Sequence, residues 1–158
     1  MNQLPKRKPN RIENYDYSQP NVYLITICTR NRERLFGTVD ARGDTPVTIL
    51  SQYGETVVRG VEGISELYGN VSVDAYSVLP NHVHLLLRLD PTDADRPPSV
   101  SRIIKQFKEY VTKTCGENLW QKGFHDRVVR SERDYQDAWN YVTNNPAKWE
   151  TDEYFVIR

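Results

Sequence analysis

The sequence predicts an α+β domain built on an antiparallel sheet, and three observations support this fold class. Stretches with strand and helix patterns follow one another in the order strand, helix, strand, strand, helix, strand, helix. Only three residues separate the second strand from the third, which predicts a hairpin between neighbouring antiparallel strands. The chain has 158 residues, 38% of them hydrophobic, which is enough for one packed core and too short for two.

The first half of the chain supplies one strand and one helix. The strand is expected at residues 22–30, because this stretch is β-branched and aromatic. Residues 31–37 are predicted to be a polar connection with a little further extended chain. From Leu50 onward, apolar residues recur at spacings of three and four, which predicts a helix with one buried face that ends at Gly69.

A hairpin and a second helix follow. Residues 71–78 and 82–89 are the two extended runs of the hairpin. Ser99 or Ser101 is suited to cap the helix, because a serine hydroxyl accepts a hydrogen bond from the first helical turn. The apolar stripe of this helix ends near Gly116, a residue type that commonly terminates helices.

The last part of the chain adds one strand and one helix. Residues 119–130 are a predicted strand with an aromatic start. Ser131 followed by Asp134 resembles a capping box, which opens a helix that runs to about Asn145, because Pro146 disfavours helical geometry in the residue before it. The elements together contain the ferredoxin-like βαββαβ unit, with helices on one face of an antiparallel sheet and one additional C-terminal helix.

Composition excludes several classes of protein. With 27% charged and 11% aromatic residues, the chain has the composition of a folded domain and not of a disordered one. Its apolar stretches are far shorter than the roughly 18 residues that a membrane span needs, so we expect a cytoplasmic protein. Two cysteines are too few for a disulfide framework or a thiolate metal cage.

The 21 basic and 21 acidic residues cancel overall, but they are unevenly distributed. Residues 1–36 and 99–130 each hold seven basic and three acidic side chains. Residues 1–20 show no periodicity and are expected to form a basic arm before a single domain at 21–158. These two basic blocks would meet a polyanion such as DNA, although solvated surface is the alternative explanation. The candidate DNA contacts are Lys6, Arg7, Lys8, Arg11, Arg102, Lys105, Lys108, Arg127 and Arg130.

Two histidines alternate along the third predicted strand. Successive side chains of a strand point to opposite faces, so His82 and His84 share one face and are about 6.5 to 7 Å apart along the strand. Val83 and Leu85 share the other face, which is apolar and therefore a core face. Two neutral histidines on a rigid strand make a plausible pair of metal ligands. A half-exposed strand also carries histidines for purely structural reasons, and spacing alone does not decide between the two.

A tyrosine and an asparagine lie close together at the end of the last predicted helix. The spacing of four residues between Tyr141 and Asn145 places the phenol and the amide on one helical face, one turn apart. The structural alternative makes Tyr141 a core aromatic and Asn145 a helix cap, and helix patterns alone favour it.

Three segments together resemble a known family: residues 79–86 (LPNHVHLL), 120–130 (WQKGFHDRVVR) and 141–146 (YVTNNP). They are similar to the REP-associated tyrosine transposases, a branch of the single-tyrosine HUH transposases, over roughly residues 20–148. The resemblance implies a ferredoxin-like fold that cuts and rejoins single-stranded DNA near hairpin-forming palindromes. It also implies a divalent ion, magnesium or manganese, no nucleotide cofactor, and a monomer or a homodimer.

The resemblance assigns roles to individual residues. His82 and His84 match the histidines that bind the ion, and Tyr141 matches the nucleophile that forms a 5′-phosphotyrosine. Asn145 occupies the position of the third ligand, where many relatives have a glutamine. His125 matches a polar or aromatic position beside an aspartate in the family, and His125 and Asp126 are candidates to contact DNA or the residues around the ion. The alternatives are a structural role for His125 and a pairing of Asp126 with Arg130 across the strand.

Several alternatives stay open at this point. Tyr110, on the basic helix, and Tyr76, on the strand that pairs with the histidine strand, are the other candidates for the nucleophile. A domesticated protein that binds DNA hairpins without cutting them would use the same fold. A metal-dependent hydrolase would use water in place of Tyr141.

Overall fold

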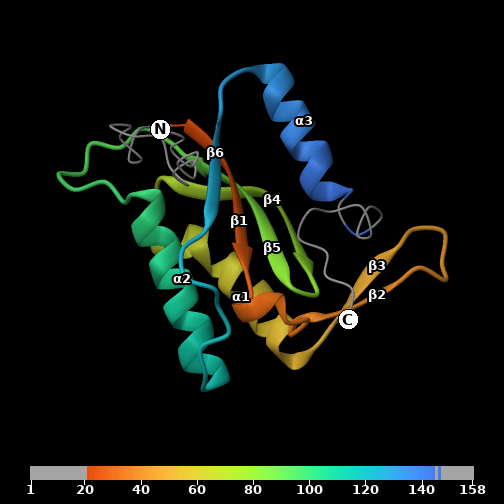
Figure 1. Cartoon of the computed structure of the whole chain (residues 1–158). Helices are drawn as coiled ribbons and strands as arrows, with labels where there is room; N and C mark the ends of the chain where they lie inside the picture. Colours follow the sequence, from red (N-terminus) through yellow and green to blue (C-terminus); the bar gives the residue numbers. More distant parts are fainter. Residues whose placement is uncertain (1–20, 145, 147–158) are drawn as a thin grey trace, which may run out of the picture.

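The computed structural model describes residues 21–144 and 146 (Figure 1). Its elements follow the predicted order, with one additional hairpin. The basic arm with Lys6, Arg7, Lys8 and Arg11 lies outside the described residues, and so does Asn145. The elements are β1 (Asn21–Cys28), a 3-10 turn η1 (Arg30–Arg32), β2 (Gly37–Asp40), β3 (Val47–Leu50), α1 (Gln52–Leu67), β4 (Val71–Leu79), β5 (His82–Leu89), α2 (Val100–Cys115), β6 (His125–Val129) and α3 (Glu132–Thr143).

Four strands form one antiparallel sheet in the order β4-β5-β1-β6. β1 is an inner strand: Thr26 pairs with His84 of β5 on one side and with His125 of β6 on the other. α1 connects β1 to β4 after the small β2–β3 hairpin, and α2 connects β5 to β6. This strand order with these two helical connections is that of the ferredoxin-like fold. The predicted fold class is therefore confirmed.

The two faces of the sheet are covered differently. On one face, α1 and α2 pack over the main core, which includes Val83, Leu85 and Leu87 of β5. On the other face, a smaller cluster holds α3 through Ala138 and Val142, together with Val22, Ala75, Leu86 and Val129 of the sheet. Figure 1 shows α3 apart from the α1 and α2 pair. The additional C-terminal helix thus covers the face that the other two helices leave open.

Serine caps fix the starts of the three helices. The Ser99 side chain accepts a hydrogen bond from the backbone N–H of Arg102, so Ser99 and not Ser101 caps α2. Ser131 caps α3 in the same way, by accepting from the N–H of Asp134. α2 ends at Gly116, whose φ of 80° lies in the left-handed region, as expected from the sequence.

Three predicted boundaries were wrong. Residues 37–50 form the β2–β3 hairpin, so α1 begins at Gln52 after its cap Ser51 and not at Leu50. The last strand covers only His125–Val129, because Trp120 makes just an isolated bridge to Thr29 and Gly123 turns the chain with a φ of 80°. α3 ends at Thr143, two residues before Asn145.

Among the helices of residues 21–144, none is long and apolar enough to cross a membrane.

Candidate active site

The two histidines of β5 lie together on the α3 face of the sheet. Both side chains are fully buried, and their Nε2 atoms are 3.1 Å apart. The ring centroids are 4.6 Å apart with the ring planes at 78°. Bonds from a zinc ion to an imidazole nitrogen are about 2.0–2.1 Å, so two nitrogens at this separation can reach one ion of this size.

Each imidazole is oriented through its other nitrogen. His82 Nδ1 is 2.6 Å from Asn81 Oδ1, and the Asn81 amide is itself fixed because its Nδ2 donates to the carbonyl of Arg32. Because the Asn81 oxygen can only accept, this contact requires the ring proton of His82 on Nδ1, which donates a hydrogen bond to Asn81 Oδ1. His84 Nδ1 is 2.9 Å from the hydroxyl of Thr26, which can accept in the same way. In this pair of tautomers the Nε2 lone pairs converge, which is the arrangement of two neutral imidazoles on one cation.

Tyr141 of α3 lies against His84 of this pair. Its ring centroid is 4.9 Å from that of His84, with the ring planes at 60°. Its side chain is 37% exposed, whereas its helical neighbour Val142 is fully buried in the cluster under α3. The phenol is thus accessible to a substrate while the helix that carries it is anchored to the sheet.

A row of polar side chains crosses the sheet at the level of His84. Cross-strand pairing places Ser77 of β4 beside His84, Thr26 of β1 on its other side, and His125 of β6 beside Thr26. Ser77 is 8% exposed, and its hydroxyl has no hydrogen-bond partner among the described residues. The predicted contribution of His125 to this face is therefore compatible with the geometry.

Asp126 lies on the opposite face. It pairs with Ile25, which belongs to the core under α1 and α2, and both carboxylate oxygens of Asp126 are buried. Because successive strand residues alternate, the carboxylate cannot point to the same side as its neighbour His125. The expectation that Asp126 contacts the residues around the ion is wrong for this reason.

The two other candidate tyrosines also lie on the far face. Tyr76 pairs with Leu85 of the main core, and its hydroxyl donates to Glu62 of α1. Tyr110 of α2 lies close to Gly60 of α1. Of the three tyrosines considered, only Tyr141 lies on the histidine side of the sheet.

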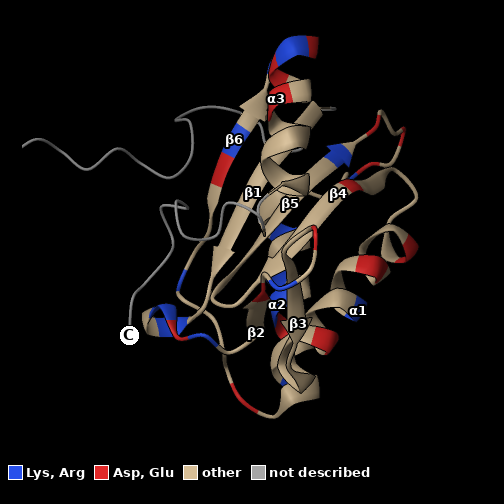
Figure 2. Cartoon of the chain, turned by 90° about the vertical axis from the view of Figure 1, so that its right-hand side faces the viewer, with Lys and Arg blue, Asp and Glu red and all other residues tan. Residues whose placement is uncertain are grey.

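The basic helix α2 is on that far face as well. α1 carries Glu55, Glu62 and Glu66 with one arginine, whereas α2 carries one glutamate and the basic residues Arg102, Lys105, Lys108 and Lys113. Figure 2 shows the acidic positions along α1. Because α1 is mainly acidic and α2 mainly basic, α2 is the more suitable of the two helices to bind a polyanion.

The predicted DNA contacts differ in their surroundings. Lys105 is highly exposed, and its ion pair with Glu109 is long, at 4.0 Å between the charged atoms. Its ammonium group therefore remains accessible to a phosphate. Lys108 instead donates to the carbonyls of Gln121 and Gly123 and holds the chain before β6. On β6, Arg127 donates to Asp134 of α3. A structural role thus accounts for Lys108 and in part for Arg127, whereas Arg102, Lys105 and Arg130 are exposed.

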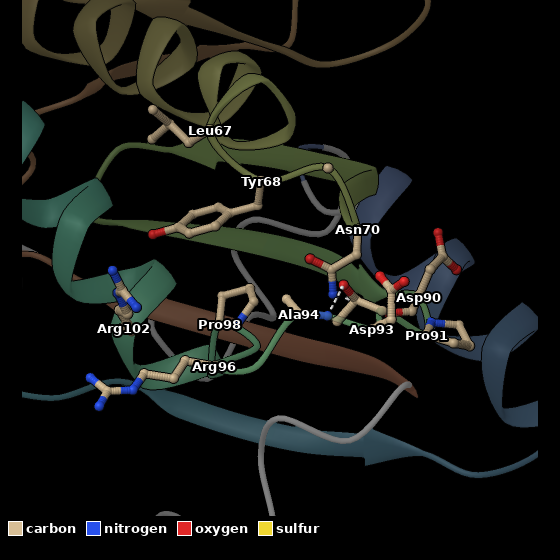
Figure 3. Close-up of a pocket in the computed structure, with 12 residues that line it drawn as sticks. Leu67, Tyr68, Asn70, Asp90, Pro91, Asp93, Ala94, Arg96, Pro98 and Arg102 are labelled. Carbon is tan, nitrogen blue, oxygen red and sulfur yellow. Dashed lines mark hydrogen bonds between the residues drawn. The ribbon is translucent and has the colours of Figure 1, made fainter.

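A cavity of about 780 Å³ lies at the other end of β5 from the histidines (Figure 3). The end of α1, the loop after β5 and the start of α2 line it, and they contribute Tyr68, Arg96 and Arg102. Asp90 and Asp93 line it too, so its charge is mixed. The cavity shares no residue with the site of His82, His84 and Tyr141.

Comparison with known proteins supports the resemblance found in the sequence, although no family model matches the chain. An uncharacterized protein of Haemophilus influenzae is 28% identical over 172 residues, which cover 95% of this chain and 93% of that protein. The REP-associated tyrosine transposase of Escherichia coli K12 is 35% identical over 77 residues, which cover 48% of this chain and 44% of that one. A protein of H. influenzae named as a candidate REP-associated tyrosine transposase is 25% identical over 144 residues, 84% of this chain and 74% of its own length.

This chain is a homologue of the REP-associated tyrosine transposases. Solved structures agree in fold. The structure of a REP-associated tyrosine transposase bound to a REP hairpin matches with a TM-score of 0.64 and 21% identity, over 88% of this chain and 73% of that one. A candidate transposase from Deinococcus radiodurans matches with a TM-score of 0.50 and 18% identity, over 85% of this chain and 95% of that one.

The sequence predicted the side chains that lie together here and missed the residues that support them. His82, His84 and Tyr141 lie together, while Asn145 cannot be placed because it is outside the described residues. Asn81 directly precedes His82 and was detectable as a neighbour that could orient the ring. Thr26 and Ser77 reach the site only through strand register, which a single sequence does not reveal.

Proposed function

We propose that this chain is a metal-dependent single-stranded DNA endonuclease and strand transferase that acts at hairpin-forming palindromes through a 5′-phosphotyrosine. The observation that carries the proposal is the contact between Tyr141 and a histidine pair whose Nε2 atoms converge. A nucleophile beside a cation site is the arrangement that phosphoryl transfer requires. The named relatives are transposases, which agrees with this reaction class.

The residues present fit a divalent ion. His82 and His84 would hold it, with the amide oxygen of Asn145 as the third protein ligand. Within residues 21–144 and 146, no group of three or more His, Cys, Asp and Glu side chains is arranged to hold a metal. A bound magnesium or manganese ion supplies Lewis-acid polarisation of a phosphate oxygen.

Tyr141 performs the covalent step. Its phenolic oxygen attacks the phosphorus, the bond from phosphorus to the 3′ oxygen breaks, and the chain is left with a 5′-phosphotyrosine. The phenol loses its proton to solvent, and the departing 3′ oxygen takes one up. The phosphodiester bond energy is kept in the protein–DNA link, so the 3′ hydroxyl of a second strand can attack the same phosphorus and release the phenol without a nucleotide cofactor.

The DNA partner is proposed from charge and from relatives. A related transposase has been solved with a REP hairpin bound, and α2 supplies exposed cations for phosphate contacts. Arg102, Lys105, Arg130 and the arm residues Lys6, Arg7, Lys8 and Arg11 are the residues we assign to this role. We place the reaction in the cytoplasm, carried out by a monomer or a homodimer.

Incubation with end-labelled single-stranded hairpins from the flanks of the chain's own gene tests the proposal. With magnesium or manganese, a denaturing gel should show a shortened strand and a protein-linked strand, and a chelator should remove both. The Tyr141→Phe variant is the control. Tight hairpin binding without cleavage under any divalent ion would instead identify a domesticated, non-cutting hairpin-binding protein. Cleavage without a protein-linked strand would identify a hydrolase.

A further inference from the structure

Three side chains join the start of α3 to the sheet. Arg88 of β5 donates to Asp74 of β4 from Nε at 2.9 Å and from Nη2 at 2.7 Å. The hydroxyl of Tyr135 on α3 donates to the same carboxylate at 2.7 Å. The Arg88 guanidinium also lies over the Tyr135 ring, 5.5 Å from its centroid. We call Asp74, Arg88 and Tyr135 the α3 clamp.

The backbone of β4 is built to place Asp74 in this position. The pairing of β4 with β5 shifts between Val73 and Ala75, so Asp74 is the extra residue of a β-bulge. Ala75, the next residue, belongs to the cluster under α3. The bulge thus turns two consecutive residues of β4 toward α3, where regular alternation would supply one.

The clamp is partly shielded from water. The Asp74 side chain is mostly buried and that of Arg88 is about two-fifths exposed. Hydrogen bonding to Asp74 raises the pKa of Arg88 above its usual value, and burial, followed by the bond to Asp74, raises the pKa of Tyr135. Arginine therefore stays charged, and the tyrosine keeps its donor proton at neutral pH.

The apolar contacts of α3 do not fix its register by themselves. Ala138 and Val142 are the two buried residues of the helix in the small cluster beneath it, and the half-buried rings of Tyr135 and Trp139 pack against the same cluster. Hydrophobic contacts of this kind are non-directional, so they hold the helix on the sheet while permitting a slide or a rotation. Directional hydrogen bonds to a charged group remove that freedom.

We propose that the α3 clamp positions Tyr141 against His84. This inference rests on the proposed function, because positioning matters for catalysis only if Tyr141 is the nucleophile. Tyr135 and Tyr141 are six residues apart on one rigid helix, about 9 Å along its axis. Fixing Tyr135 on Asp74 therefore fixes the phenol against His84, and a misplacement of about 1 Å can slow a positioned reaction about 100-fold.

Tyr135→Phe tests the clamp, because it removes one hydroxyl and keeps the ring. Tyr76→Phe is the control: it also removes a tyrosine–carboxylate hydrogen bond, the longer and more exposed one to Glu62 at 3.3 Å, on the other face of the sheet. Two readouts need no activity: the NMR cross-peak between the rings of Tyr141 and His84, and hydrogen exchange of the α3 amides. Tyr135→Phe should weaken the cross-peak and speed α3 exchange about tenfold, with β1 and β5 unchanged. Tyr76→Phe should change neither.

The kinetic readout separates positioning from binding. With saturating hairpin DNA, Tyr135→Phe should form the covalent adduct about 10- to 100-fold more slowly, with DNA and metal affinities within twofold of wild type. Arg88→Lys keeps the positive charge but loses the planar guanidinium, and its rate of adduct formation should lie between those of wild type and Tyr135→Phe. If the Tyr141–His84 cross-peak and the hydrogen exchange of the α3 amides are unchanged in both Tyr135→Phe and Arg88→Lys, the proposal is overturned. If wild type forms no adduct but the two activity-free readouts respond, the proposed function fails and the clamp stands.

Discussion

The imidazole of His84 and the phenol of Tyr141 meet at 4.9 Å between ring centroids, one from an inner strand and the other from a helix added outside the βαββαβ unit. The proposed ion ligands and the proposed nucleophile thus belong to separate elements that are held by separate contacts. Removing either function should leave the other intact.

Tyr141→Phe should abolish the protein–DNA adduct while hairpin affinity and metal affinity stay within twofold of wild type. Only a partly exposed phenolic oxygen is removed, and the ring contact with His84 remains. A denaturing gel measures the adduct, and titration of labelled hairpin measures binding. An adduct that survives denaturation in this variant would show that another tyrosine is the nucleophile.

His82→Ala or His84→Ala should lower manganese affinity at least 100-fold and stop metal-dependent cleavage, with hairpin binding retained. Each change removes one of the two converging nitrogens, and a single imidazole is a weak site for magnesium or manganese. Isothermal titration with manganese checks the affinity. Full cleavage by either variant would contradict the assignment of the ion to this pair.

Thr26→Val should lower metal affinity about 10- to 100-fold, because the Nδ1 atom of His84 loses the oxygen that fixes its tautomer. The substitution keeps the shape of the side chain and the strand. Thr56→Val, at a buried threonine of α1 whose hydroxyl donates to the Gln52 carbonyl, is the control and should leave metal affinity unchanged. Equal affinities for the two variants would exclude an orienting role for Thr26.

Lys105→Ala should reduce the dependence of hairpin affinity on salt. Removing one phosphate contact lowers the slope of log affinity against log salt by about 0.7 for single strands. Arg59→Ala removes the same charge from the acidic helix α1 and should leave the slope unchanged. Replacing Lys6, Arg7, Lys8 and Arg11 together tests the arm, and an unchanged slope would remove the arm from the interface.

Asp134→Asn should reduce stability at pH 7 by about 0.5–1 kcal/mol, with little effect in strong acid. The Arg127 guanidinium holds the pKa of Asp134 below its usual 3.8 in the folded chain. A carboxylate with a lowered pKa contributes its full stabilisation above the unfolded-state pKa and loses it as the pH falls through the folded-state pKa. Urea unfolding should separate wild type from variant at pH 7 and bring them together well below pH 3.8. A constant difference at every pH would contradict this.

Local periodicity in the sequence predicted most of the sheet and the shared face of His82 and His84, whereas the roles of these histidines and of Tyr141 were predicted from the resemblance to a known family. Alternation in β5 is sufficient to put His82 and His84 on one face. The β2–β3 hairpin was missed, since its tip carries charge, glycine and proline, and its Val47 and Ile49 are exposed, so no core requires them. The α3 clamp depends on a bulge in β4 and a pairing between distant strands, neither of which has a local pattern.

The inner position of β1 also constrains how the chain folds. Its two neighbours are residues 82–89 and 125–129, so the first strand of the sheet gains its last partner only after most of the domain has left the ribosome. Before β6 arrives, one edge of a nearly all-buried strand has unpaired N–H and C=O groups, a template for pairing with another chain. Fragments that stop short of residue 125 should therefore aggregate, whereas fragments that end after β6 and lack α3 should keep β1 paired on both sides.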